Sequence, residues 1–140
     1  MKTANNNLQL KLETPLMVFS YRLFPYWFGR SNFLLLTTTG RKSQRQRTVI
    51  VVCMSVEGGY MVVAANVGSD AQPAWYLNLI QRPQAQIQIG MTKLAIQAEE
   101  ISGAEREKLW ADWIKTHPGY ARFQAKTNRP FPIMLLRSGG

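Results

Sequence analysis

Four cations fall within seven residues in the stretch TTTGRKSQRQR (37–47), which turns on Gly40 between two apolar runs. They are Arg41, Lys42, Arg45 and Arg47. So compact a cluster suits one or two phosphates held at fixed range, because Arg donates forked hydrogen bonds and Lys supplies a point charge. A solvated hairpin end is the plain alternative. We do not expect a nucleic-acid partner, since that function favours basic residues interleaved with exposed aromatics over a broad face.

A second loop, NVGSDAQPAW (66–75), runs from small residues into the start of a predicted helix. Free amides at a helix N-terminus carry partial positive charge and favour an acidic or carbonyl-rich ligand edge. Gly68 permits close backbone approach. Trp75 could cover a flat ring, or it could plug the end of a barrel. Two such loops on neighbouring strands would form an elongated pocket, with a phosphate at one end and a ring at the other.

Several kinds of catalytic site are excluded by the residues present. The chain has one His and one Cys, so a zinc cluster is not expected, and no other metal site is predicted. No Walker loop, nucleophile elbow or paired carboxylate centre is evident. If the protein is an enzyme, its reactive atoms therefore belong to a cofactor.

The elements that must position these loops are predicted to be short strands with a few helices. The 140 residues fit one domain, and 46% hydrophobic with 18% charged residues is globular composition, with a net charge of +9. Tight connections favour an antiparallel sheet, and about six such strands in so short a chain commonly roll into a small barrel. The predicted strands are 33–39, 47–56, 60–66, 84–90, 92–101 and 131–137, and the predicted helices are 73–83, 104–117 and 119–127.

The N-terminal segment, residues 1–30, is predicted to be helical and distinct from a barrel domain at 31–140. It either packs on the domain or lies on a membrane surface, because residues 14–30 combine clustered aromatics with Arg22 and Arg30. No signal peptide or membrane span is evident. The single Cys53 suits a reducing compartment, so we expect a cytoplasmic protein with an optional peripheral contact on the inner face of the membrane.

Three motifs in order resemble the deazaflavin (coenzyme F420)-dependent nitroreductase and quinone reductase family. They are LLLTTTGRKSQRQRTVIVV, VVAANVGSDAQPAWYLNL and HPGYARFQAKTNRPFPIMLL, and the resemblance runs from about Phe33 to Leu136. It implies a split β-barrel with flanking helices (mainly β, α+β), bound F420, and hydride transfer to a quinone, a nitro compound or another activated acceptor. Related split barrels bind FMN, so an FMN-dependent reductase is the alternative. A non-enzymatic carrier or membrane-associated binding protein also stays open.

The resemblance also implies site residues. The phosphate and the glutamate tail of the cofactor would lie against Thr39, Arg41, Lys42 and Arg47, and the deazaflavin ring against Pro73, Ala74 and Trp75. Further cofactor-binding residues would be Ser43, Ala65, Asn66, Gly68, Ser69 and Asn78. Tyr120 would act at the acceptor, as a hydrogen-bond partner of its oxygen. Split barrels often dimerise, so a homodimer is implied as well.

The chain departs from the family pattern in three places, the last of which concerns the range of acceptors more than the cofactor. Family members often carry a Ser-x-Gly-Gly loop where this chain has Ala65–Gly68, which removes a hydroxyl near the cofactor unless Asn66 or Ser69 substitutes for it. The family's Gly-x-Pro-Arg is Arg45-Gln46-Arg47 here, with no proline. Nitroreducing members also place tyrosines three residues on either side of the Tyr120 position, where this chain has His117 and Phe123.

Overall fold

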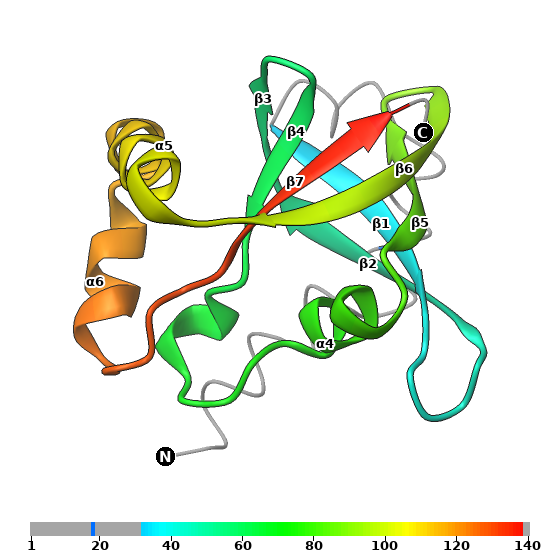
Figure 1. Ribbon diagram of the computed structural model, residues 1–140, viewed down its shortest axis with the longest axis horizontal. Helices are drawn as coiled ribbons and strands as arrows, with labels where there is room; N and C mark the ends of the chain where they lie inside the picture. Colours follow the sequence, from blue (N-terminus) through cyan, green and yellow to red (C-terminus); the bar gives the residue numbers. More distant parts are fainter. Residues whose placement is uncertain (1–17, 19–31, 139–140) are drawn as a thin grey trace.

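The computed structural model describes Val18 and residues 32–138, which form one curled sheet with helices at its open end and on one outer face (Figure 1). The strands are β1 (Phe33–Thr39), β2 (Gln46–Val52), β3 (Met54–Val56), β4 (Gly59–Val63), β5 (Gln84–Ile89), β6 (Thr92–Ile101) and β7 (Ile133–Ser138). The helices are the 3-10 turn η1 (Asn66–Gly68), α4 (Ala74–Gln81), α5 (Gly103–Thr116) and α6 (Gly119–Ala125).

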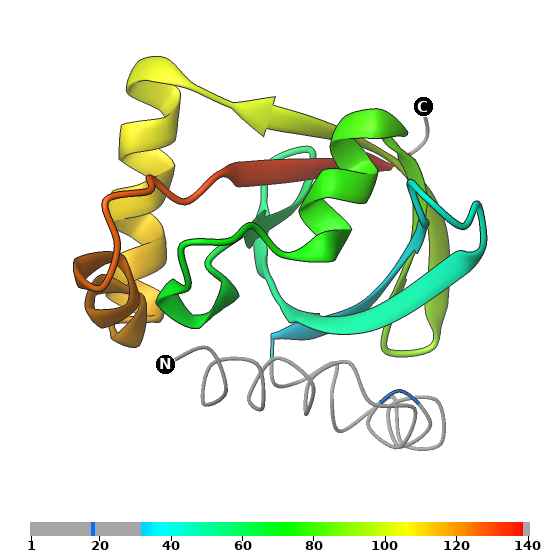
Figure 2. The ribbon, with the colours of Figure 1, turned by 90° about the horizontal axis from the view of Figure 1, so that it is seen from below.

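The seven strands form one antiparallel sheet in the order β2-β1-β5-β6-β7-β4-β3. Its two outermost strands, β2 and β3, are consecutive in the chain and are separated by Cys53 alone. A sheet whose first and last strands are joined in this way must curl back on itself, and Figure 2 shows the resulting half-open barrel. The predicted class, a mainly antiparallel split barrel with flanking helices, is confirmed.

The strand count is seven and not six, because the predicted strand 47–56 divides at Cys53. The first part pairs with β1 and the second part pairs with β4, at opposite ends of the sheet. At the bend, the backbone N–H of Cys53 donates to the carbonyl of Asn32 at 2.8 Å. The thiol is buried at the bend, and burial raises its pKa to about 12, so the thiol stays protonated at neutral pH and is a poor nucleophile.

Alternation along the strands divides the core into two clusters. Leu34 and Leu36 of β1 and Val62 of β4 point into the barrel, where Trp75 and Leu79 of α4 fill the space between them. The opposite face of the sheet at β4 and β7 is covered by α5 and α6, through a second cluster. Its buried members are Met61, Val63, Ala65, Ile101, Trp113, Phe131, Ile133 and Leu135. The helix that carries Trp75 is thus fixed at the barrel mouth.

The predicted N-terminal helix and the surface contact of residues 14–30 lie outside the described residues, apart from Val18. That side chain is 8% exposed and packs with Leu35 and Ile50 on the face of β1 and β2 opposite the barrel interior. The boundary at 30/31 and the membrane contact stay predictions. Across Val18 and residues 32–138, no helix is long and apolar enough to span a membrane.

Candidate functional site: a cleft with a basic and an apolar end

The basic turn, residues 40–45, is a closed loop between β1 and β2. Gly40 N donates to Arg45 O, and Gln44 N donates to Gly40 O, each at 2.8 Å. Ser43 Oγ accepts a further hydrogen bond from Arg45 N at 3.1 Å. A Cβ on Gly40 would lie 2.7 Å from Ser43 Oγ and 3.2 Å from Arg45 O, so the turn favours glycine here. Its backbone therefore fixes the points from which its cations extend.

A buried amide joins the basic turn to α4. Asn78 Oδ1 accepts a hydrogen bond from Arg41 N at 3.0 Å, and Asn78 Nδ2 donates to Thr38 Oγ1 at 3.0 Å. Asn78 is 4% exposed and Thr38 is 1% exposed. A buried amide with both of its ends engaged holds two elements in one specific arrangement. The sequence prediction placed Asn78 at the cofactor, whereas its hydrogen bonds also assign it the task of placing Arg41.

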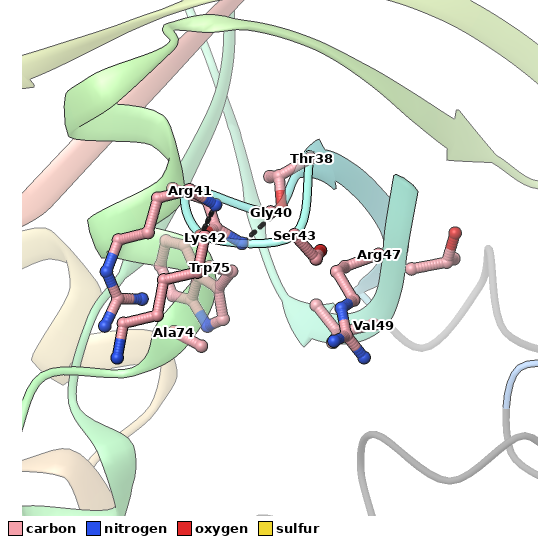
Figure 3. A pocket seen from close by; sticks show the side chains of 11 residues that line it. Thr38, Gly40, Arg41, Lys42, Ser43, Arg47, Val49, Ala74 and Trp75 are labelled. Carbon is pink, nitrogen blue, oxygen red and sulfur yellow. Dashed lines mark hydrogen bonds between the residues drawn. The ribbon is translucent and has the colours of Figure 1, made fainter. Parts of the chain in front are cut away.

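The first cavity, here the basic cavity, has a volume of about 400 Å³ and lies between the basic turn, β2 and α4. Figure 3 shows Arg41 and Lys42 extending in a similar direction from the turn, while Arg47 and Val49 project from β2 on the other side. Hydroxyl groups from Thr38, Ser43 and Thr48 add further donors. None of the described residues that line this cavity carries a carboxylate. Three cations without a counter-charge make it a site for an anion.

In the structure, the loop between β4 and α4 runs over residues 64–72, and from here on it is called the second loop. It contains three consecutive residues in the left-handed region. The φ angles are 46° at Asn66, 56° at Val67 and 83° at Gly68. A β-branched residue such as Val67 rarely adopts this conformation, and such strain persists only where the surroundings impose it. A Cβ on Gly68 would lie 2.6 Å from the carbonyl oxygen of Phe123, so the loop packs directly on α6.

The second cavity, here the apolar cavity, has a volume of about 300 Å³ and carries no charged side chain among its described lining residues. Its walls come from β2, the second loop, α4 and α6. The lining residues are Phe33, Val49, Ile50, Val51, Val52, Val63, Ala65, Asn66, Val67, Trp75, Tyr120 and Phe123.

Tyr120 is the tyrosine among the described residues that line the apolar cavity, and its ring packs against aromatic neighbours. It makes edge contacts with Trp113 and Phe123, each at a centroid distance of 5.2 Å. Burial raises the pKa of Tyr120 to about 12, so the hydroxyl keeps its proton at neutral pH. His117 stacks on Trp113 at 4.4 Å, and burial lowers its pKa, which keeps the imidazole neutral. The site therefore offers a neutral hydrogen-bond donor in an apolar wall.

The two cavities adjoin, because Val49 and Trp75 line both of them. Trp75 is 6% exposed and also belongs to the barrel core, so both predicted roles of this indole, ring wall and barrel plug, describe the same side chain. The combined cleft has a cation-lined end and an apolar end, an arrangement that suits an elongated ligand with an anionic part and a flat apolar part.

The structure brings together most of the residues that the resemblance implied. Arg41, Lys42, Ser43, Arg47, Ala74, Trp75 and Asn78 line the basic cavity, and Ala65, Asn66, Trp75 and Tyr120 line the apolar cavity. Thr39, Gly68, Ser69 and Pro73 line neither. Thr39 faces a separate hollow of about 100 Å³, and the Ser69 hydroxyl accepts a hydrogen bond from Ala71 N.

Sequence reasoning missed two kinds of residue. Val49 and Val51 read as ordinary strand positions, and only the curl of the sheet brings them to the cleft. Arg129 contacts the second loop from 57 to 65 positions further along the chain. Its one signal in the sequence is a single cation in the otherwise uncharged stretch TNRPFPIMLL.

Comparison with known proteins bears on the chemistry of this cleft. The family model of the F420H(2)-dependent quinone reductases matches residues 25–138. A putative F420H(2)-dependent quinone reductase of Mycobacterium tuberculosis is 31% identical over 104 residues, which cover 74% of this chain and 87% of that protein. The solved structure of an F420-H2 dependent reductase, FDR-A, is 34% identical, with a TM-score of 0.69 over 76% of this chain and 94% of that one.

A further solved structure, described as a domain-swapped dimer, is also 34% identical, with a TM-score of 0.70 over 76% of this chain and 80% of that chain. The residues matched by the family model, 25–138, contain the basic turn, the second loop and α6, and the family that the motifs predicted is confirmed. The chain belongs to the F420H(2)-dependent quinone reductase family.

Proposed function

We propose that this protein is an F420H2-dependent oxidoreductase that transfers a hydride from the reduced deazaflavin to a quinone or a similar activated acceptor. The observation that carries the proposal is the cleft in which Trp75 and Val49 join a cation-lined cavity to an apolar one. The parts of coenzyme F420 match the two ends of this cleft, since an anionic, phosphate-bearing chain is attached to a flat ring.

The residues present fit the anionic part of this cofactor. Arg41, Lys42 and Arg47 line the basic cavity with no carboxylate among the described residues beside them. Each hydrogen bond from such a cation to a phosphate or carboxylate oxygen contributes roughly 1.5–3 kcal/mol. The Asn78 tie keeps the Arg41 backbone in place before the ligand arrives, so little ordering of the turn has to accompany binding.

The residues of the apolar cavity fit the ring and the acceptor. When bound, the reduced deazaflavin supplies the hydride. The valines of β2 and the indole of Trp75 exclude water from this end of the cleft, which strengthens every polar interaction within it. Tyr120 holds its proton and can donate a hydrogen bond to the acceptor oxygen as negative charge develops there.

The test is an anaerobic assay of the full chain with reduced F420 and menadione as acceptor. We expect the absorbance of oxidised F420 to appear only when protein and menadione are both present, and F420 to bind in a fluorescence titration. A purified protein that releases FMN on denaturation and binds no F420 would contradict the proposal and favour the flavin alternative.

We also propose that the protein forms a homodimer. Support comes from a relative that is 34% identical over 76% of this chain and whose structure is described as a domain-swapped dimer. Light scattering coupled to gel filtration is expected to give twice the mass of 15.9 kDa. A single species at the monomer mass over a range of protein concentrations would refute this.

We further propose a cytoplasmic location with peripheral membrane contact through residues 14–30. Support comes from the single cysteine, which cannot form an internal disulfide, and from the aromatic and basic residues of that segment. The full chain is expected to pellet with anionic liposomes. A variant in which Trp27 and Phe28 are replaced by Ser is expected to stay in the supernatant. Equal sedimentation of both proteins would speak against the membrane contact.

A further inference from the structure

Arg129 uses its whole guanidinium to hold the second loop. Nε donates to Ser69 O at 3.1 Å, and Nη2 donates to the same oxygen at 2.8 Å. Nη2 also donates to Ala65 O at 2.9 Å, while Nη1 donates to Ala64 O at 3.0 Å and to Gln72 Oε1 at 2.7 Å. Few side chains could replace this arrangement, because only the planar fork of Arg reaches acceptors in several directions at once.

The acceptors span almost the full length of the second loop, from Ala64 to Gln72. Between them lie the left-handed residues Asn66 and Val67; Asn tolerates this conformation, whereas the β-branched Val67 keeps it only where surrounding contacts hold it. A second tie from the same segment, the Thr127 hydroxyl donating to Asp70 Oδ1 at 2.5 Å, acts further along the loop. The segment that follows α6 thus braces the loop at both of its ends and at its middle.

The braced loop is also a wall of the apolar cavity. Ala65, Asn66 and Val67 line that cavity, opposite the strand β2 residues that complete it. Arg129 lines neither cavity, and its ring contact is with Phe131, at 5.0 Å from the guanidinium carbon to the ring centroid. Any influence of Arg129 on the reaction must therefore pass through the position of the loop.

We propose that Arg129 is a positioning residue, which sets the wall formed by Ala65–Val67 and thereby the fit of the acceptor in the apolar cavity. The proposal rests on the proposed function for the identity of the reaction. The basic cavity is fixed independently, through Asn78, so Arg129 acts on the acceptor end of the cleft and leaves the anionic end in place.

The test compares Arg129→Gln and Arg129→Lys with the wild type. Arg129→Lys keeps the charge but loses the fork, so both variants are expected to fail in the same way. Arg137→Gln is the matched control, because Arg137 is exposed and, among the residues that the structure describes, its guanidinium pairs with Glu99 at the surface, at 3.0 Å. Two readouts are needed: hydrogen exchange of the amides in residues 64–72, and steady-state kinetics with menadione beside F420 titrations.

We expect loop amides to exchange at least about tenfold faster in both variants while strands β1 and β6 exchange as in the wild type. The kcat/KM for menadione should fall about 10- to 100-fold, because a wall displaced by about an ångström has an effect of that size. The dissociation constant of F420 should change by a smaller factor than kcat/KM does, since the cations that bind its phosphate are untouched and only the wall beside its ring is displaced.

Loop exchange or menadione kinetics at the wild-type level in Arg129→Lys would overturn the proposal. So would exchange that rises equally in the loop and the strands, since that pattern is a general loss of stability. If Arg129→Gln does not fold, Arg129→Lys decides the question. A wild-type protein that binds no F420 would refute the proposed function, whereas the exchange experiment would still support or overturn the brace by itself.

Discussion

At the scale of single residues, the cations of the basic cavity reach it from two directions, Arg41 and Lys42 from the turn and Arg47 from β2. Arg45 belongs to the same sequence cluster but is exposed and lines neither cavity. The cluster of four cations in the sequence therefore divides into three that face the site and one that faces solvent.

This division predicts which charges matter for the cofactor. Arg41→Ala and Lys42→Ala should each raise the dissociation constant of F420 about 10- to 100-fold, because a lost charged hydrogen bond corresponds to roughly 1.5–3 kcal/mol. Turnover at saturating cofactor should change less. Arg45→Ala is the matched control and should bind as the wild type does in a fluorescence titration. Equal losses in all three variants would mean that the turn acts only through its general charge.

Tyr120 gives a second prediction at this scale. Tyr120→Phe removes the donor and should lower kcat for menadione about a hundredfold, with little change in cofactor affinity. Because burial raises the pKa of Tyr120 to about 12, the ratio of wild-type to variant kcat should stay constant between about pH 6 and pH 9. Tyr76→Phe is the control, since that hydroxyl donates to Glu100 at 2.7 Å and lies at neither cavity. A ratio that collapses within this range would contradict the assignment.

At the scale of elements, the structure depends on ties between segments that lie far apart in the chain. Asn78 joins α4 to the end of β1 and to the basic turn, across 37 and 40 positions. Sequence reasoning placed Asn78 on a helix beside the cofactor, but a spacing pattern cannot show which backbone group a buried amide will meet.

The Asn78 tie can be tested by an apolar replacement of similar shape. Asn78→Leu leaves the Arg41 N–H and the Thr38 hydroxyl without their partner, which should lower the free energy of unfolding by about 1–3 kcal/mol. Affinity for F420 should fall as well, because Arg41 loses the anchor of its backbone. Gln81→Leu, on the exposed side of the same helix, is the control for urea denaturation and titration. Unchanged affinity in a destabilised Asn78→Leu would show that the amide serves stability alone.

The sequence predicted the elements well wherever local signals decide them. Alternation marked β5 and β6, and Pro73 together with Arg82-Pro83 marked the ends of α4 to within a residue or two. The break at Cys53 was missed, because Val51–Val56 is a largely apolar stretch with no Gly or Pro to mark a strand end. That break follows from strand pairing at two ends of the sheet, which is tertiary information.

The candidate site shows the same division. The basic turn and the loop before α4 were predictable because glycine, cations and small residues have local meanings. The wall of the apolar cavity that Ala65–Val67 form was not predictable in the same way. It depends on the left-handed conformation of Asn66 and Val67, which Asn tolerates but a β-branched Val rarely adopts, and on the hydrogen bonds that Arg129 donates to the loop from a remote segment.

At the scale of the whole molecule, two buried ionisable groups make the free energy of unfolding depend on pH in the alkaline range. The pKa of Cys53 is raised by burial from 9.0, and that of Tyr120 from 10.0, each to about 12. Both groups stay protonated in the folded state while they ionise in the unfolded chain. Their contribution to stability is therefore complete below pH 9 and is lost as the pH rises from 9 towards 12.

The free energy of unfolding should accordingly decline through this range, by at most about 1.4 kcal/mol per pH unit for each group. Cys53→Ala removes one of them, so urea denaturation at about pH 8 to 11 should give a shallower decline in this variant than in the wild type. Parallel curves for the two proteins would exclude the thiol as a source of the effect. The bend between β2 and β3 is kept in the variant, because its hydrogen bond to Asn32 uses the backbone.

The two ends of the cleft are held by different ties. Asn78 is hydrogen-bonded to the basic turn and Arg129 to the second loop, and only Val49 and Trp75 among the described residues line both cavities. Substitutions can therefore accumulate in the second loop and on α6 while the cofactor anchor is conserved. During the evolution of such proteins, this separation allows the range of acceptors to change while each variant still binds the reduced cofactor that supplies its electrons.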